Sequence, residues 1–208
     1  MLEAHISKLL LATNNAGKVR ELSALLTETS FRITSPITEG IDLDVEETGT
    51  TFEENAAIKA LAFAQNAGLL SIADDSGLEV DALFGEPGVR SARYGGEGAS
   101  DADRIIYILN KLQGISWDNR KATFRSVLAL ADINGIIKIF HGECHGYIAF
   151  EPKGVGGFGY DPIFYLPSIG KSMSELNTEQ KNEISHRGIA VKKAVNYLKH
   201  WQRDIRVT

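Results

Sequence analysis

The sequence contains little cysteine and no long apolar run, and each shortage excludes a class of protein. Cys144 is the only cysteine, so neither a disulfide framework nor a cysteine-based zinc cluster can form within one chain. Because Cys144 lies in a strand-like run, we expect a half-buried structural thiol rather than a nucleophile. No apolar run approaches the roughly 20 residues that a membrane span needs, and the N-terminus shows no signal peptide. These absences predict a cytoplasmic, reduced protein.

The chain has no net positive charge, and it lacks several common motifs. The formal net charge is −5, which argues against a protein that coats nucleic acid, since such proteins need a clustered basic surface. One small polyanion at a local site is still compatible with this charge. The first strand-to-helix turn is neither a GxxxxGK[ST] nor a GxGxxG loop, HExxH is absent, and no internal repeat is present. We expect a single domain over residues 1–208 that binds neither nucleic acid nor membrane.

The pattern of apolar residues predicts an α/β fold. Thr51 and Glu54 form a capping box before an apolar helix that Gly68 ends, and Asn134-Gly135 is a strong hairpin signal. Helices that alternate with strands, together with one hairpin, indicate a mixed sheet. The predicted strands are 9–12, 31–34, 70–73, 78–82, 123–133 and 136–150, and the predicted helices are 19–26, 51–67, 100–112 and 185–201.

The segment Thr13-Asn14-Asn15-Ala16-Gly17-Lys18 connects the first strand to the first helix. A helix N-terminus presents unpaired N–H groups and a partial positive charge, so it binds anions readily. A lysine there opposes the helix dipole unless an anion lies between them. Asn14, Asn15 and Gly17 tolerate the unusual backbone angles that such a turn needs. The segment is a candidate phosphate site, although a plain connecting turn remains the alternative.

Acidic pairs supply candidate metal ligands. Asp74 and Asp75 follow an apolar run, where we expect a strand end, and successive side chains of a strand point to opposite faces. An Asx-turn is the structural alternative. If the fold brings Glu46 or Glu47 near Asp75, the carboxylates suit Mg²⁺, which also uses water and substrate phosphates as ligands. Lys59 lies in the middle of the capped helix, either as a solvated residue or in the site.

The C-terminal third contains aromatic and cationic groups. Phe158-Gly159-Tyr160-Asp161 offers flat faces for stacking a base and an acceptor for a ring N–H, or else serves as an ordinary loop anchor. Ser185 is a good N-cap, and His186-Arg187 places two potentially cationic groups in the first turn of a helix. Such groups oppose the helix dipole and need an acid or a ligand.

The order of these motifs resembles the inosine/xanthosine triphosphate pyrophosphatase family, also called Ham1-like. The resemblance spans nearly the whole chain and leaves out only a few residues before the first strand. The segments that carry it are TNNAGK at 13–18, ETGTTFEENAAIKA at 47–60, ADDSGLEVDAL at 73–83, PGVRSARY at 87–94, GGFGYDPIF at 156–164 and SHRG at 185–188.

The resemblance implies a Mg²⁺-dependent enzyme that converts dITP, ITP and XTP to the monophosphate and pyrophosphate. It also implies a homodimer whose long mixed, twisted sheet is flanked by helices, with an active-site cleft between two lobes. Asp75 would activate water with the support of Asp74, and the catalytic Lys59 would assist in holding the triphosphate. Glu47 (or Glu46) and Asp75 would hold the metal. The residues implied in substrate binding are Thr13, Asn14, Asn15, Ala16, Gly17, Lys18, Ser76, Phe158, Gly159, Tyr160, Asp161, Lys181, His186 and Arg187.

Two other functions remain open at this point. A purine-nucleotide sensor would use the same phosphate and base groups without a productive water. A nucleotidase of the related Maf type would act on modified pyrimidines, although the SHRG and FGYD segments favour the purine family. The segment 85–98, with Arg90 and Arg93, is expected to be a mobile loop that closes over the substrate.

Overall fold

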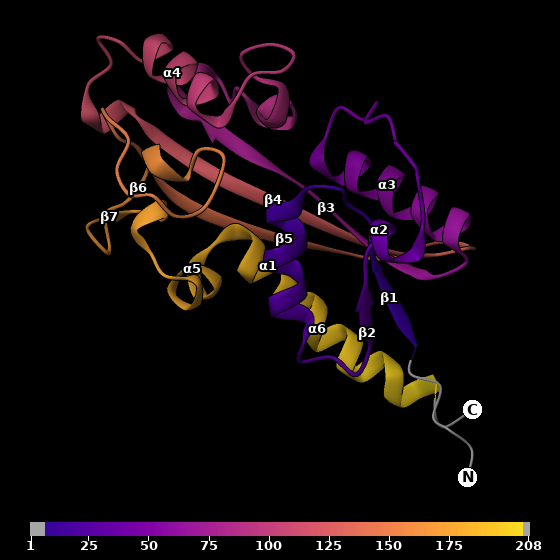
Figure 1. Cartoon of the computed structure of the whole chain (residues 1–208). Coiled ribbons are helices and arrows are strands. Elements are labelled where there is room, and N and C mark those ends of the chain that lie inside the picture. Colours follow the sequence, from indigo (N-terminus) through magenta and orange to yellow (C-terminus); the bar gives the residue numbers. More distant parts are fainter. Residues whose placement is uncertain (1–6, 206–208) are drawn as a thin grey trace. The chain divides into compact units, whose positions relative to one another are not determined.

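The computed structural model describes residues 7–205, with side chains as far as Trp201. Residues 1–6, which precede the first strand and bear on the signal-peptide prediction, lie outside the described residues. The strands form one seven-stranded sheet in the order β2-β1-β3-β4-β5-β6-β7. β1 pairs in parallel with β2 and β3, whereas β5–β6 and β6–β7 are antiparallel. The predicted mixed sheet flanked by helices is confirmed (Figure 1).

The helices and strands follow one another along the chain as labelled in Figure 1. The strands are β1 (Lys8–Leu11), β2 (Arg32–Thr34), β3 (Leu70–Val80), β4 (Lys121–Asp132), β5 (Gly135–Ile148), β6 (Phe164–Leu166) and β7 (Lys171–Ser172). The α-helices are α1 (Ala16–Leu26), α2 (Pro36–Glu39), α3 (Phe52–Ala67), α4 (Asp101–Lys111), α5 (Thr178–Ile184) and α6 (His186–Ile205). None of the helices within residues 7–205 combines the length and apolar character that crossing a membrane requires.

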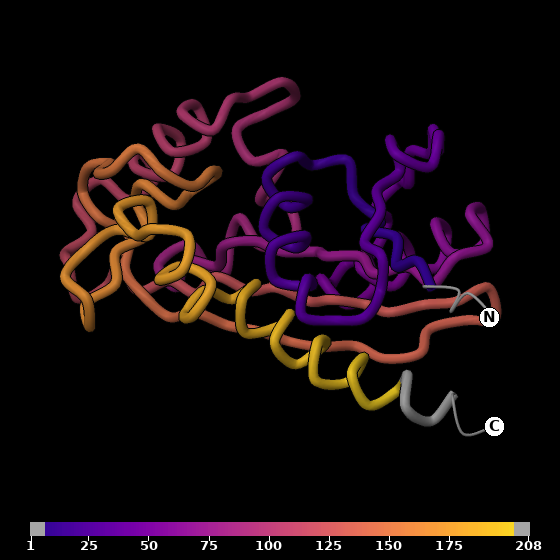
Figure 2. The backbone as a smooth tube through the Cα atoms, turned by 60° about the horizontal axis from the view of Figure 1, so that its bottom comes forward, coloured from indigo at the N-terminus to yellow at the C-terminus, as the bar shows by residue number. Residues whose placement is uncertain are grey.

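The chain divides into two compact units. Unit 1 contains residues 1–75, 127–141 and 189–208, and unit 2 contains residues 76–126 and 142–188. In unit 1, the apolar side of α6 packs on Leu128, Leu130 and Phe140. In Figure 2, α6 accordingly runs along the hairpin formed by β4 and β5. Burial of this apolar stripe, from Val191 to Leu198, stabilises α6 in the way its sequence predicts.

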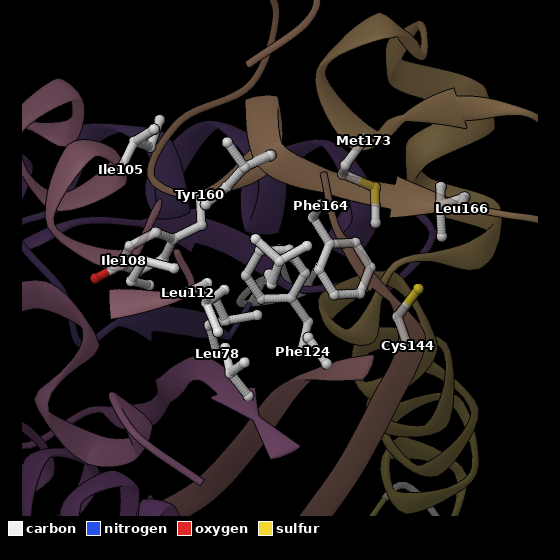
Figure 3. Packing of buried hydrophobic residues seen from close by; sticks show 14 of the residues in the cluster. Leu78, Ile105, Ile108, Leu112, Phe124, Cys144, Tyr160, Phe164, Leu166 and Met173 are labelled. Carbon is white, nitrogen blue, oxygen red and sulfur yellow. The ribbon is translucent and has the colours of Figure 1, made fainter. Parts of the chain in front are cut away.

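Unit 2 has a core of its own, in which aromatic rings and aliphatic side chains fill the space between sheet and helices. The Phe124 and Phe164 rings lie 4.3 Å apart between centroids, and Leu78, Leu112 and Met173 surround them (Figure 3). Ring pairs at this distance add to the stability that burial of their area supplies. This core holds in place the strands and loops that carry the candidate site residues of unit 2, from Phe158 to Asp161 among them.

Several predicted elements have the expected ends because their caps are local. Thr51 and Glu54 form the predicted capping box of α3, and Gly68 ends that helix in the left-handed conformation with φ +64°. Ser100 and Asp103 make the corresponding box for α4. The hydroxyl of Ser185 accepts a hydrogen bond from the Gly188 N–H at 3.0 Å, as an N-cap does. Such caps depend on neighbours within one turn, so the sequence alone predicts them.

The prediction for the segment from Asp74 to Gly77 is corrected by the structure, because this segment forms neither a strand end nor a turn. One strand, β3, runs from Leu70 to Val80 through both aspartates. The alternative of an Asx-turn is therefore wrong, and Asp74 and Asp75 lie in the middle of a buried strand. Polar residues in series resemble a turn, but here distant lysines compensate their burial.

Other differences concern short elements and one loop. Helix α1 begins at Ala16 rather than at Val19. The segment 85–98, which we expected to be a mobile loop, contains a 3₁₀ helix at Gly88–Arg93, and the buried Ser91 hydroxyl accepts a hydrogen bond from the Leu78 N–H at 2.9 Å. The sequence analysis missed α2, β6, β7 and α5, each of seven residues or fewer, because periodicity is weak in such short segments.

Candidate active site

The turn between β1 and α1 is a helix cap with ordinary backbone angles. Asn15 is extended (φ −73°, ψ 111°), and its side-chain oxygen accepts a hydrogen bond from the Lys18 N–H at 3.0 Å. The Thr13 hydroxyl in turn accepts from the Asn15 N–H at 3.2 Å. None of the described residues 13–18 has a positive φ, so the expected unusual backbone angles at Asn14, Asn15 and Gly17 are wrong. Asn14 and Ala16 are exposed.

Lys18 reaches from the first turn of α1 to strand β3. Its ammonium lies 2.9 Å from the Asp74 carboxylate and donates to the Asp74 carbonyl at 3.2 Å. Asp74 is fully buried, and a buried carboxylate requires such a partner. This ion pair supplies the anion that the sequence analysis required near a lysine at a helix N-terminus.

The side-chain nitrogen of Lys59 contacts three acidic residues. Its ammonium lies 2.7 Å from Glu47 Oε1 and 3.3 Å from Asp75 Oδ1, and it donates to the Asp74 carbonyl at 3.0 Å. The Lys59 side chain is only 11% exposed, so it is not the solvated residue that a helical lysine usually is. Glu46, by contrast, is exposed. The fold thus brings Glu47 rather than Glu46 beside Asp75.

Burial and the charges in this cluster change the pKa values of Lys59 and Asp75. Burial opposes the charge on Lys59, but the carboxylates of Asp75 and Glu47 outweigh it, so the pKa of Lys59 is raised. Burial also raises the pKa of the Asp75 carboxyl, against the opposing effect of the Lys59 and Lys18 ammonium groups. A carboxyl with a raised pKa in a buried site is a stronger base than an exposed one.

The acidic cluster fits a hard cation that binds through few protein ligands. Within residues 7–205 no group of three or more His, Cys, Asp or Glu side chains gathers as a complete metal site. Two carboxylates nevertheless share the Lys59 ammonium, and Asp75 Oδ2 is buried without a hydrogen-bond partner among the described residues. Mg²⁺ typically binds one or two carboxylates, with waters and substrate phosphates as its remaining ligands. The donor set therefore fits Mg²⁺ rather than a metal held by the protein alone.

Unit 2 contains a second cluster, around Asp161. Its Oδ2 accepts from the Lys181 ammonium at 2.6 Å and from the Phe158 N–H at 2.9 Å. Gly157 has φ +73°, and a Cβ there would lie 2.0 Å from the same oxygen, so only glycine fits. Arg187 donates to the Ser76 hydroxyl at 2.7 Å. Lys181 therefore contacts Asp161, and Arg187 contacts Ser76, as members of one predicted cluster.

Phe158 presents the flat face of the second cluster. Lys181 Nζ lies 5.0 Å and the Arg187 guanidinium 5.5 Å from the centroid of its ring, which is partly exposed. Cations over a ring are attracted by its quadrupole. The expected stacking face on Tyr160 is wrong, because its ring is 4% exposed and lies in the core (Figure 3), and its hydroxyl donates to the Ser91 carbonyl at 2.8 Å. His186 is buried and stacks on Phe124, with 4.7 Å between centroids.

Two polar residues contact these clusters without having been predicted. Asp101 accepts a hydrogen bond from the Gly159 N–H at 2.6 Å, and no local sequence signal relates residues that are so far apart along the chain. Asn55 lies one helical turn before Lys59, and its fully buried carboxamide accepts from the Gly49 N–H at 2.8 Å. The signal for Asn55 was available, since residues four apart share a helix face.

Comparisons with known proteins show the family to which the chain belongs. The model of the Ham1 family matches residues 9–197. A relative from Desulforamulus reducens named dITP/XTP pyrophosphatase is 51% identical over 191 residues, which cover 92% of this chain and 95% of that protein. A protein of the same name from Yersinia pseudotuberculosis is 46% identical, over 93% of this chain and 99% of its own length.

Solved structures give the same result. A HAM1 protein from Coxiella burnetii superposes with a TM-score of 0.85 at 42% identity, over 93% of this chain and 99% of that chain. The Ham1 protein of Staphylococcus aureus gives a TM-score of 0.83, with the same identity and coverage. From the family match over most of its length, the shared fold and the gathered motifs, we conclude that this chain belongs to the Ham1 family.

Proposed function

We propose that this chain hydrolyses the deaminated purine nucleoside triphosphates dITP, ITP and XTP to the nucleoside monophosphate and pyrophosphate, with Mg²⁺ as cofactor. The observation that carries the proposal is the convergence of Glu47 and Asp75 on one buried ammonium, with Lys18 on the neighbouring aspartate. Relatives at about half identity are named dITP/XTP pyrophosphatases. Such an enzyme removes damaged purines from the nucleotide pool.

The polyphosphate binds at the cluster of unit 1. The N-terminus of α1 and the ammonium groups of Lys18 and Lys59 bind and orient its oxygens. Thr13 and Asn15 stabilise this turn, because their side chains accept hydrogen bonds from the Asn15 and Lys18 N–H groups. Hydrolysis of a phosphoanhydride depends mainly on positioning and charge neutralisation, and these groups supply both.

Asp75 acts on the water. Its buried carboxylate accepts a proton from the attacking water, and its raised pKa makes it a better acceptor than an exposed aspartate. Asp74, held by Lys18, fixes the strand behind it. Glu47 and Asp75 would hold Mg²⁺, which supplies charge neutralisation on the polyphosphate when it is bound.

The base binds at the cluster of unit 2. Phe158 offers its ring for stacking, and the buried donors Lys181, His186 and Arg187 suit the 6-oxo group of hypoxanthine or xanthine. The 6-amino group of adenine would present donors to donors. A site that leaves a buried donor unpaired rejects the wrong substrate by about 10⁴-fold or more.

The experiment measures pyrophosphate release from ITP, XTP, ATP and GTP at a range of Mg²⁺ concentrations. We expect turnover of ITP and XTP only with Mg²⁺, at about 10⁴ times the kcat/KM for ATP. Comparable rates on all four nucleotides would contradict the base assignment. No release from any of them would contradict the assignment as an enzyme and favour a nucleotide sensor.

The assembly and location are part of the same proposal. We propose one domain of two lobes over residues 1–208, which the two compact units support. The resemblance to the family suggests a homodimer, which light scattering on the purified protein tests. The expected cytoplasmic location is checked by cell fractionation.

A further inference from the structure

Asn55 lowers the stability that helix α3 would have with an apolar residue at the same position. It is fully buried inside a helix, where alanine or leucine would favour the helix more. Its Oδ1 accepts the Gly49 N–H at 2.8 Å, but its Nδ2 is buried with no hydrogen-bond partner among residues 7–205. A buried donor without a partner lowers stability. The carboxamide therefore needs a reason other than the packing of α3.

Gly49 lies against this helix so closely that no side chain fits. A Cβ at Gly49 would lie 2.6 Å from Asn55 Oδ1 and 2.6 Å from the Glu54 Cβ. The φ of Gly49 is outside the left-handed region, so space rather than backbone conformation requires the glycine. The hydrogen bond and the close approach together fix the backbone of Gly49 on α3.

Glu47 precedes Gly49 by two residues, so the same contact determines where its carboxylate lies. Lys59, one turn after Asn55, binds that carboxylate at 2.7 Å. The segment around Glu47 is thus attached to α3 twice, by its backbone at Asn55 and by its side chain at Lys59. The two attachments differ, because a phosphate or a cation competes with the Lys59 ion pair, whereas neither competes with a bond between a backbone N–H and an amide oxygen.

We propose that Asn55 is a positioning residue for the metal: it holds the Glu47 segment on α3, so that Glu47 and Asp75 stay together when Lys59 turns to the polyphosphate. This inference depends on the proposed function. Residues that orient metal ligands typically change metal affinity or activity by 10–100-fold when they are replaced. Asn55 contacts neither the cation nor the substrate in this role.

The test compares Asn55→Ala with Ala64→Gly by the binding of Mn²⁺, followed by electron paramagnetic resonance, with a non-hydrolysable ITP analogue present. Ala64 is also fully buried in α3, so its replacement weakens the same helix without touching a polar group. We expect Asn55→Ala to raise the Kd for Mn²⁺ by 10–100-fold, and Ala64→Gly to change it by less than about twofold. At saturating Mg²⁺, the kcat of Asn55→Ala should return to within about tenfold of the unmodified protein.

A second variant shows whether Asn55 acts through Gly49. Gly49→Ala should raise the Kd for Mn²⁺ in the same way, and the double variant Gly49→Ala/Asn55→Ala should be little worse than either single one, because both changes break one link. Additive effects would overturn the proposal. If Asn55→Ala does not fold, Gly49→Ala decides alone, and an unchanged Kd in that variant contradicts the proposal.

The outcomes separate this inference from the proposed function. If the unmodified protein binds Mn²⁺ and releases pyrophosphate, but Asn55→Ala binds Mn²⁺ as tightly as Ala64→Gly does, only the inference about Asn55 is wrong. If the unmodified protein neither binds Mn²⁺ with the analogue nor turns over ITP, the proposed function fails, and the inference fails with it.

Discussion

The carboxyl group of Asp75 lies within a buried strand, 3.3 Å from the Lys59 ammonium. Its replacement by asparagine keeps the shape of the side chain but removes its ability to accept a proton. We expect Asp75→Asn to lower the rate of pyrophosphate release by about 10²–10⁴-fold. Nucleotide binding, measured by calorimetry, should weaken by less than about tenfold, because the lysines and the base cluster remain.

The control for that experiment is Asp81→Asn, an exposed aspartate directly after the same strand. It should leave both rate and binding unchanged. Retention of turnover in Asp75→Asn would show that another group accepts the proton. Equal loss of turnover and of binding would favour a purely structural role for Asp75.

Cys144 gives a prediction about pH. Burial raises the pKa of the Cys144 thiol to about 11, well above its ordinary value of 9.0. Since the thiolate is the reactive form, iodoacetamide at pH 8 should modify Cys144 about 100 times more slowly than a solvated thiol. The rate, followed by mass spectrometry, should rise about tenfold per pH unit between pH 7 and 10 as the thiolate fraction grows. Modification in urea at the rate of free cysteine is the control, and rapid modification of the folded protein would contradict the assigned pKa.

Among the loops and element ends, Arg120 joins the end of one helix to the end of a strand. It is 3% exposed, and its guanidinium donates to the carbonyls of Leu112 at 2.9 Å, Ile148 at 2.8 Å and Ala149 at 3.2 Å. Arg120→Met would remove one hydrogen-bond donor from each of these three carbonyls. We expect the free energy of unfolding in urea to fall by about 3 kcal/mol, since each hydrogen bond to a charged group contributes about 1.5–3 kcal/mol.

Arg125 in β4 is the matched control, because it pairs with Glu79 and Glu143 in partly exposed ion pairs. Pairs of this kind contribute about 1 kcal/mol or less. Arg125→Met should therefore destabilise the protein much less than Arg120→Met. Equal losses would show that burial of the guanidinium is not what makes Arg120 important.

At the same scale, the elements show which features a sequence can predict. The caps at Thr51, Ser100 and Ser185 depend on residues within one turn, and they are where the sequence places them. The continuity of β3 depends instead on Lys18 and Lys59, which lie 56 and 15 residues from Asp74. Local polarity suggested a turn at that point. Only the folded chain supplies the cations that let two aspartates remain in a buried strand.

For the molecule as a whole, the boundaries between the two units fall inside β3, β4, β5 and α6. Neither unit is therefore one continuous stretch of chain, and three strands and one helix would have to break for one unit to unfold alone. Trp201 belongs to unit 1 and Trp117 to unit 2, so each reports on one unit. The variants Trp117→Phe and Trp201→Phe should show coincident fluorescence midpoints in urea, as a single cooperative transition requires. Midpoints that differ, after correction for the stability of each variant by circular dichroism, would show that the units unfold separately.

The sequence by itself determined the class of fold, the capped helices, the hairpin and the order of the polar motifs, because these depend on periodicity and on neighbours a few residues apart. The tertiary structure alone decided that Glu47 rather than Glu46 lies beside Asp75, that Tyr160 is a core residue, and that Asn55 holds Gly49. Each of these depends on contacts between distant segments. A one-residue shift along an extended chain turns a side chain to the opposite face, and only the packed partner fixes that choice.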